Sequence, residues 1–356
     1  MVEERVREIR LNPIIPIESV LIASARGARP VTKHESFEPD RRTRVDGCPF
    51  CSGNEDQTPE ESLREPDSKE WQIRVVRNLY PVLDDDHNLP GYELGMHRVI
   101  EGYGRHEVVI DHRNHGIQIY QMDAAHIGAI LVVYRERMKK LYQSAAGHSY
   151  VLIFKNYGPA SGGSIAHTHS QIIAMPIIPA NVEIEISSSR KLYSQYERCI
   201  FCMLIDENLS YETTVYDPTD GPVHRSIEVG RYIVDKNESF VAIKPFASRF
   251  PWEIHILPRI HSHDFRKVTD AECMDFAILL QRVMARLQVL LGVVQYNFFL
   301  HSAPAKMTEA DHQACFHWHL EICPRTTIPN GFELGSGLAI NTLSPEEAVR
   351  RLREAD

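Results

Sequence analysis

The sequence has no long hydrophobic run and no excess of positive charge. No apolar stretch approaches the roughly 20 residues that a membrane-spanning helix needs, which argues against a membrane protein built on helices. The formal net charge of −9 argues against a general nucleic-acid-binding protein, because such proteins need a basic surface. The first residues are charged and lack an apolar segment, so we expect no signal peptide and a cytoplasmic location.

Cysteine is also scarce, with 7 in the 356 residues. An odd number does not fit a fully paired disulfide framework. Four of the seven form two CxxC pairs, Cys48 with Cys51 and Cys199 with Cys202. In an intracellular protein this spacing indicates a metal site before a disulfide, although a single CxxC is equally compatible with a redox pair.

The two CxxC pairs belong to an internal repeat. Five marker residues recur 146 to 151 positions later in the chain: Cys48, Cys51, His115, His167 and His169 recur as Cys199, Cys202, His261, His317 and His319. Each copy is predicted to contain two strands, a helix, a third strand and a strand with the HxH motif, with the helices over residues 124–144 and 270–291. The expected fold is therefore α+β with an antiparallel sheet, divided into domains at residues 1–195 and 196–356.

The repeat predicts one metal site in each half. The ligand sets are Cys48, Cys51, His115 and His167 in the first half, and Cys199, Cys202, His261 and His317 in the second. A tetrahedral Cys₂His₂ set suits zinc, and because all four ligands come from the protein, each site would be structural.

Only the first HxH motif follows a loop rich in glycine and serine. Asn156 precedes this loop, and Gln171 follows the motif by two residues. Backbone N–H groups in a glycine-rich loop can approach a phosphate closely, so the stretch is compatible with a phosphate site beside an imidazole pair. Taken alone, it is equally compatible with a turn before a solvent-exposed strand. Because the second HxH has no such loop, we interpret it as structural and His319 as non-catalytic.

These motifs resemble the galactose-1-phosphate uridylyltransferase family, the transferase branch of the histidine-triad superfamily. The resemblance rests on segments spread over most of the chain, at residues 26–30, 48–51, 78–81, 115, 156–171 and 331–333. It implies a duplicated histidine-triad-like fold with an antiparallel half-barrel sheet and flanking helices. It also implies a homodimer whose sites draw on both subunits.

The resemblance further implies a ping-pong reaction. His169 would attack the α-phosphorus of a nucleotide sugar such as UDP-glucose, release a hexose 1-phosphate and pass the nucleotidyl group to a second sugar phosphate, such as galactose 1-phosphate. Gln171 would hold the α-phosphate. By the same resemblance, the substrate-binding residues are Arg26, Arg29, Asn78, Asn156, Gly162, Ser164, Phe332 and Glu333.

Three alternatives remain open. The tail at residues 331–341 and the second CxxC look more like the ADP-glucose phosphorylase branch, which transfers an adenylyl group to phosphate. The second metal could instead use the glutamate and three histidines found in some family members, here Glu185, His301, His317 and His319. The third alternative, from a different class of protein, is a zinc-ribbon binding module without catalysis.

Overall fold

One antiparallel sheet runs through both halves of the chain. The computed structural model describes residues 7–28, 37–85, 91–210, 213–217, 221–225, 230–307 and 310–355. Within these residues the sheet has ten strands, in the order β12 (Ile233–Lys236), β13 (Phe240–Ile243), β14 (Ile254–Pro258), β16 (His319–Pro324), β15 (Tyr296–His301), β8 (Tyr150–Tyr157), β9 (His169–Met175), β7 (Arg105–Ile110), β4 (Ile73–Arg77) and β3 (Glu61–Glu65). Every neighbouring pair is antiparallel.

The two halves meet at the centre of the sheet, where β15 pairs with β8. On either side of this seam the order of elements is the same: β4, β7, α1, β8 and β9 in the first half, and β13, β14, α4, β15 and β16 in the second. This arrangement confirms the predicted α+β fold with a duplicated unit. The boundary between domains at residue 195 stays a prediction, since the sheet is continuous across both halves.

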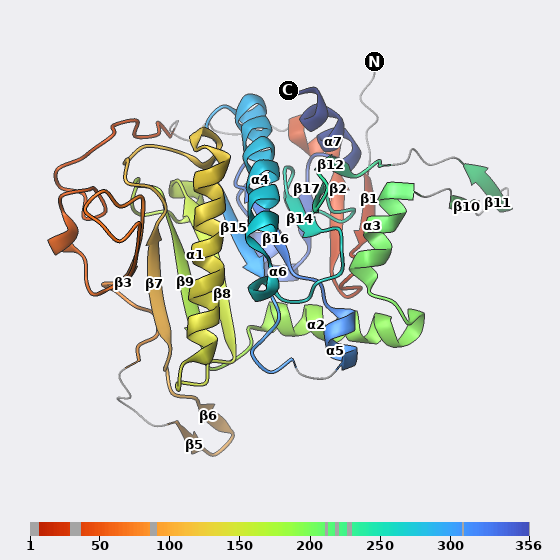
Figure 1. Cartoon of the computed structure of the whole chain (residues 1–356). Helices are drawn as coiled ribbons and strands as arrows, with labels where there is room; N and C mark the ends of the chain where they lie inside the picture. The colour runs from red at the N-terminus through yellow and green to blue at the C-terminus, as the bar shows by residue number, and fades with distance from the viewer. Residues whose placement is uncertain are drawn as a thin grey trace.

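Two long helices cover one face of the sheet and lie side by side (Figure 1). They are α1 (Ala124–Gln143) and α4 (Asp270–Leu291), which agree with the helices predicted over 124–144 and 270–291. Helix α4 begins with a capping box. The Thr269 hydroxyl accepts from the backbone N–H of Glu272, and the Glu272 carboxylate accepts from the backbone N–H of Thr269. It ends at Gly292, whose φ of 69° suits a residue without a side chain.

The apolar side chains of these helices and of the sheet strands form the main core. Phe276 of α4 stacks on Phe240 of β13 with ring centroids 5.0 Å apart, and Trp318 packs against both rings. Of the helices that the structure describes, none has the length and apolar character needed to cross a membrane.

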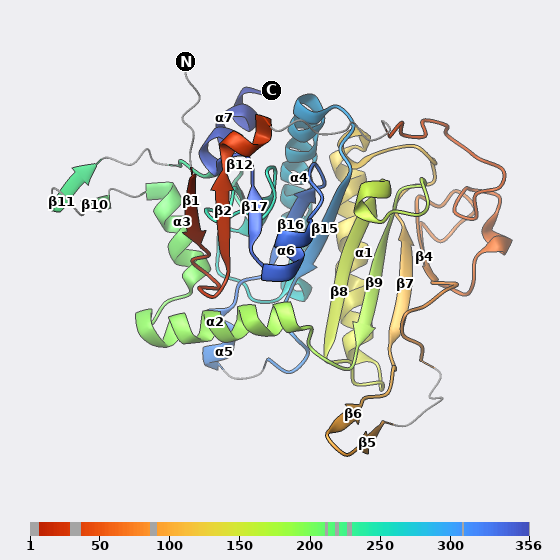
Figure 2. The same ribbon diagram turned by 180° about the vertical axis from the view of Figure 1, so that it is seen from behind.

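The opposite face of the sheet is covered in the second half only (Figure 2). The covering elements are α2 (Ala180–Tyr196), α3 (Ile200–Ser210), α6 (Gly331–Ser336) and a three-stranded sheet of β1 (Arg7–Leu11), β2 (Ser19–Ala23) and β17 (Ala339–Asn341). Among the described residues, no helix crosses β7, β8 and β9 on this face. This face of the first half, which includes the HxH strand β9 (His169–Met175), is therefore left open.

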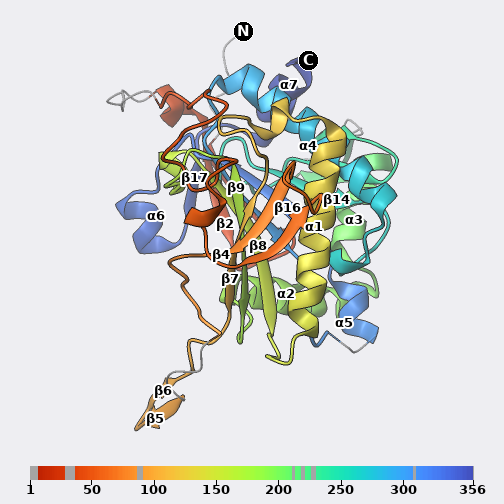
Figure 3. The same ribbon diagram turned by 60° about the vertical axis from the view of Figure 1, so that its left-hand side comes forward.

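The remaining elements lie at the periphery. The hairpin of β5 (Tyr92–Leu94) and β6 (His97–Val99) projects from the body of the molecule beyond β7 (Figure 3). A second hairpin joins β10 (Thr213–Asp217) to β11 (Gly221–Arg225). Helix α5 (Ala310–Cys315) precedes the second HxH strand, and α7 (Pro345–Glu354) closes the described chain.

Candidate functional site

Each half brings its two cysteines together with two histidines. In the first half, Sγ of Cys51 lies 3.4 Å from Nδ1 of His115 and 3.5 Å from Nδ1 of His167. Sγ of Cys48 lies 3.7 Å from the same His167 nitrogen. In the second half, Sγ of Cys202 lies 3.3 Å and 3.6 Å from Nδ1 of the two partner histidines, His261 and His317. The four side chains of each half thus form a compact group that could hold a metal ion.

The spacing of these groups fits a tetrahedral metal. An ion about 2.3 Å from sulfur and about 2.0 Å from nitrogen separates the sulfur and nitrogen ligands by about 3.5 Å. Burial lowers the pKa of His167 to about 3, which keeps its imidazole neutral, as a metal ligand must be.

The histidines of both groups are oriented by their second nitrogen. Nε2 of His167 lies 2.7 Å from the carbonyl oxygen of His112, and Nε2 of His115 lies 3.4 Å from the carboxylate of Asp40. In the second half, the corresponding Nε2 atoms lie 3.0 Å and 2.9 Å from the carbonyl oxygens of Gln313 and Pro258. A partner on the far nitrogen fixes which ring nitrogen faces the cysteines, as it does in metal sites.

His169 is oriented by its own backbone. Its Nδ1 lies 2.8 Å from the carbonyl oxygen of His167, so Nδ1 carries the proton and Nε2 carries the lone pair. The ring of Phe50, from the Cys48–Cys51 segment, packs edge-on against the imidazole with centroids 5.3 Å apart. Burial lowers the pKa of His169, so the imidazole is neutral and can act as a nucleophile.

The glycine-rich loop is held in place by the second half of the chain. Gly158 and Gly162 have φ angles of 84° and 79°, a region that side chains disfavour. The Asn297 amide, on β15, donates to the carbonyl oxygen of Ser161 at 2.9 Å and to Oδ1 of Asn156 at 2.8 Å. Asn297 was not predicted as a site residue from the sequence, because its partner on β8 is distant in the chain.

A buried histidine connects two of the predicted site residues. Nε2 of His106, on β7, lies 2.8 Å from Oε1 of Gln171 and 3.1 Å from Nδ2 of Asn78. Burial lowers the pKa of His106, which favours the neutral ring. This link was also missed, since His106 belongs to none of the repeated motifs.

The other predicted substrate residues lie in the glycine-rich loop, in a short helix near the start of the chain and on α6. Ser164 and Gly162 are exposed in the loop, and Arg26 is exposed in the short helix Ser24–Ala28. Phe332 and Glu333 are on α6, where Phe332 is 46% exposed. Among the described residues, no hydrogen bond or ion pair joins Arg26 or Glu333 to His169. Arg29 lies outside the described residues.

The second HxH motif has the same backbone geometry in a different electrostatic setting. Nδ1 of His319 lies 3.0 Å from the carbonyl oxygen of His317, and Phe201 packs against the ring with centroids 5.4 Å apart. Its Nε2, however, lies 3.3 Å from Glu185 and 3.4 Å from Glu321. Although burial lowers it, these two carboxylates raise the pKa of His319 to about 9.

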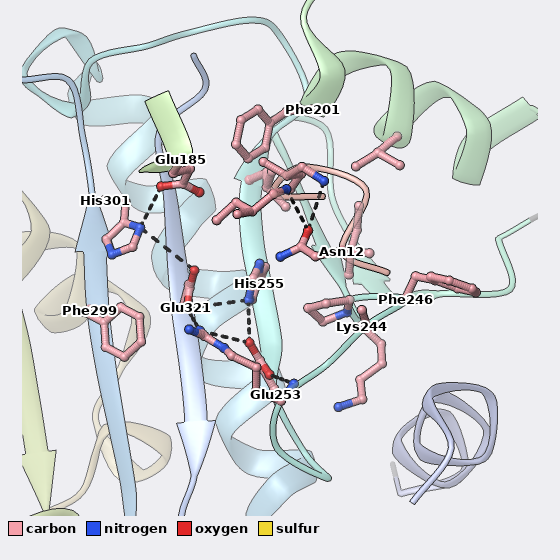
Figure 4. A pocket seen from close by; sticks show the side chains of 18 of the residues that line it. Asn12, Glu185, Phe201, Lys244, Phe246, Glu253, His255, Phe299, His301 and Glu321 are labelled. Atoms are coloured by element: carbon pink, nitrogen blue, oxygen red, sulfur yellow. Dashed lines mark hydrogen bonds and ion pairs between the residues drawn. The ribbon is translucent and has the colours of Figure 1, made fainter. Parts of the chain in front are cut away.

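A third group of side chains that could hold a metal ion surrounds His319, and three of its four members line a cavity of about 720 Å³. The group consists of Glu185, His301, His319 and Glu321. Figure 4 shows His301 between Glu185 and Glu321, with His255 on the neighbouring strand β14 and Glu253 directly before that strand. This group differs from the predicted alternative metal set in one member, because it contains Glu321 and not His317. His317 lies with Cys199, Cys202 and His261, so the Cys₂His₂ group and the Glu/His group are both present.

Models of two protein domains match the chain. The N-terminal domain of galactose-1-phosphate uridyl transferase matches residues 2–179, and the C-terminal domain of the same enzyme matches residues 209–354.

Individual relatives extend over nearly the whole chain. An ADP-glucose phosphorylase from Arabidopsis thaliana is 30% identical over 99% of this chain and 94% of that protein. A galactose-1-phosphate uridylyltransferase from Thermotoga maritima is 29% identical over 98% of both chains.

Solved structures show the same fold. The crystal structure of an ADP-glucose phosphorylase from Arabidopsis thaliana with bound ADP-glucose superposes with a TM-score of 0.80, at 28% identity, over 98% of this chain and 99% of that one. A uridylyltransferase structure gives a TM-score of 0.72 at 25% identity over 98% of both chains.

Proposed function

The chain belongs to the galactose-1-phosphate uridylyltransferase family, and on that premise we propose that this nucleotidyltransferase moves a UMP group from UDP-glucose to galactose 1-phosphate. The observation that carries the proposal is the state of His169. Its Nδ1 proton is engaged by the His167 carbonyl, which leaves the lone pair of Nε2 available for attack.

The reaction then proceeds in two displacements. Nε2 of His169 attacks the α-phosphorus, a P–N bond forms, and the bond to the β-phosphate oxygen breaks to release glucose 1-phosphate. A phosphate oxygen of galactose 1-phosphate next attacks the same phosphorus and breaks the P–N bond, which returns His169 to its neutral form. The product is UDP-galactose. One site that serves two substrates in turn gives ping-pong kinetics.

Gln171 is proposed to hold the α-phosphate beside the nucleophile. Its Oε1 is engaged by His106, which leaves the amide N–H groups free to face phosphate oxygens. A glutamine cannot donate and remove protons as a histidine does, so it does not activate water. This property favours transfer to a sugar phosphate over hydrolysis.

The substrate is proposed to lie along the open face of β7, β8 and β9. Asn78, Asn156 and the loop with Gly162 and Ser164 would contact the nucleotide. Arg26 and Arg29 would contact phosphate oxygens, and Phe332 and Glu333 would contact the sugar. Because α6 covers the second half of the sheet, a contact from Phe332 and Glu333 to the sugar would come from a second copy of the chain. Exposed apolar side chains beside the site support a homodimer, with Leu79, Tyr80 and Val82 exposed by 60 to 82%.

The two Cys₂His₂ groups are proposed to bind one structural zinc ion each. Cys48, Cys51, His115 and His167 would hold the first ion, and Cys199, Cys202, His261 and His317 the second. Zinc with four protein ligands supplies a rigid crosslink and no open position for chemistry. The four cysteines of these groups have no disulfide partner, which also supports a reducing, cytoplasmic location.

ADP-glucose phosphorylase activity is the second candidate. The second CxxC pair and the tail at residues 331–341 favour it, because both features resemble the ADP-glucose phosphorylase branch of the family. In this alternative the chemistry at His169 is unchanged, while the base is adenine and the acceptor is phosphate.

The donor and the acceptor can be identified from the mass of the intact protein. We expect UDP-glucose, added without an acceptor, to increase the mass of the chain by one UMP group, and galactose 1-phosphate to remove it. An AMP increment from ADP-glucose that is removed by phosphate would favour the second candidate. No increment with either donor would contradict nucleotidyl transfer and support a non-catalytic binding protein.

Replacing His169 with glycine tests the nucleophile. We expect His169→Gly to lower the transfer rate by a factor of about 10⁴ or more, because the covalent route is lost, while zinc content stays normal. The matched control is His319→Gln at the equivalent position of the second half, which is expected to retain the nucleotidyl adduct. Normal transfer by His169→Gly would refute the mechanism.

Removing one ligand tests the metal assignment. His167→Ala is expected to reduce the bound zinc from about two ions per chain to about one, measured by elemental analysis of the purified protein, and to lower the thermal midpoint. Cys199→Ser is expected to remove the other ion. His148→Ala, a buried histidine outside the three groups, serves as the control. A zinc content unchanged in His167→Ala would rule out this ligand set.

A further inference from the structure

A buried charged pair lies directly behind the strand that carries His169, on the side covered by α1. Lys155 on β8 and Asp111 after β7 are each 1% exposed, and Nζ of Lys155 lies 2.6 Å from Oδ2 of Asp111. Burying two charges is costly, and apolar residues in place of such a pair are often neutral or stabilising. Stability alone therefore does not account for this pair, and the proposed reaction does not use it.

The pair contacts three consecutive residues of the nucleophile strand. Besides Asp111, the Lys155 ammonium donates to Oγ1 of Thr168 at 2.8 Å and to the carbonyl oxygen of His169 at 2.9 Å. These contacts use all three N–H groups of the ammonium. The Asp111 carboxylate accepts from the Ser170 hydroxyl at 2.9 Å, and the Tyr134 hydroxyl of α1 donates to that same serine. The carbonyl oxygen of His169 and the hydroxyl groups of the two flanking residues are thus held from behind.

The second half of the chain provides an internal comparison. Gln171 is opposite Phe154 and Val108, whereas Glu321 is opposite Phe299 and His255. This register makes the two halves equivalent position by position. The positions of Lys155, Asp111, Thr168 and Ser170 in the first half are occupied by Leu300, Pro258, Trp318 and Leu320 in the second.

The second half forms the same HxH geometry without any charge behind it. The His319 imidazole still lies 3.0 Å from the carbonyl oxygen of the preceding histidine, compared with 2.8 Å for His169. The fold and the ring orientation therefore do not require a buried ion pair. The charged pair lies behind His169, whose Nε2 is free for attack. Behind His319, whose Nε2 faces two carboxylates, the equivalent positions are apolar.

We propose that Lys155, neutralised by Asp111, is a positioning residue for nucleotidyl transfer. Together with Asp111, it holds the carbonyl oxygen of His169 and the hydroxyl groups of Thr168 and Ser170. The strand therefore keeps its position while the imidazole forms and breaks its bond to phosphorus. Lys155 cannot touch the substrate, because its ammonium is buried on the helix side with every N–H engaged. This inference rests on the proposed function of His169 and adds the residues that keep it aligned.

The test removes both charges together, since removing Lys155 alone would leave the Asp111 carboxylate buried without a partner. In the double variant Lys155→Met/Asp111→Asn, we expect the single-turnover rate of nucleotidylation at saturating UDP-glucose or ADP-glucose to fall about 100-fold, the size of effect that a small misalignment produces. The half-saturating donor concentration should change less than about threefold, because binding is not affected. Zinc content and thermal midpoint should stay near those of the wild-type chain. Leu300→Met, at the equivalent position of the second half, is the matched control and should match wild type.

Asp111→Asn alone separates geometry from charge. Without the carboxylate charge the buried lysine releases a proton, but its amine can still pair with the asparagine side chain and donate to the His169 carbonyl oxygen. The rate should therefore stay within about threefold of wild type. If this variant is as slow as the double variant, the carboxylate charge rather than Lys155 controls the reaction, and the proposal is wrong. A double variant that transfers normally, loses zinc, fails to fold or changes only the half-saturating concentration would likewise overturn it.

Hydrogen exchange keeps the proposal testable apart from activity. The backbone amides of residues 168–171 should exchange about tenfold faster in the double variant than in the wild-type chain, because the strand is less constrained. A wild-type chain that forms no covalent adduct would refute the proposed function. In that case, unchanged exchange in the double variant would also refute the role of Lys155, and faster exchange would retain it as an ordering contact of this strand.

Discussion

The hydrogen bond between Nδ1 of His169 and the carbonyl oxygen of His167 is the interaction on which the rest of the site depends. It decides which ring nitrogen carries the proton, and therefore which one can attack. The acceptor belongs to the residue whose own side chain lies with Cys48 and Cys51. A metal ion in that group would thus fix the backbone oxygen that orients the nucleophile. His167 of the Cys₂His₂ group and His169, the proposed nucleophile, are two positions apart on one segment, so neither can move independently.

The duplicated fold allows a comparison between His169, the proposed nucleophile, and its counterpart His319. In both HxH motifs the first histidine belongs to a Cys₂His₂ group. The second histidine makes the same backbone hydrogen bond and packs against a phenylalanine from the CxxC segment. What differs is the group two residues later. Gln171 is a neutral amide engaged by His106, whereas Glu321 is a carboxylate that faces His319 together with Glu185. Only the first half also has the glycine-rich loop beside the imidazole.

The sequence alone predicted the features that repeat within it. Constant offsets between the CxxC and HxH motifs predicted the duplicated α+β fold, and the structure brings each Cys₂His₂ set together. Contacts between strands distant in the chain were not predictable in this way. The partners of His106, Asn297 and the Lys155–Asp111 pair lie on strands that are neighbours only in the folded sheet, which are β7, β8, β9 and β15. The pairing and register of these strands cannot be read from a single sequence. Glu321 was missed as a partner of His319 for a simpler reason: a glutamate in a strand carries no motif.

The assignment of His169 as the nucleophile is tested most directly by finding which residue carries the nucleotidyl group. The wild-type chain, loaded with its donor and digested at neutral to alkaline pH to preserve the P–N bond, should give a single modified peptide that contains residues 167–171. Fragmentation should place one nucleotidyl group on His169 and none on the peptide that contains His319. A group on His319, or on a residue outside both HxH motifs, would contradict the assignment of the reactive half.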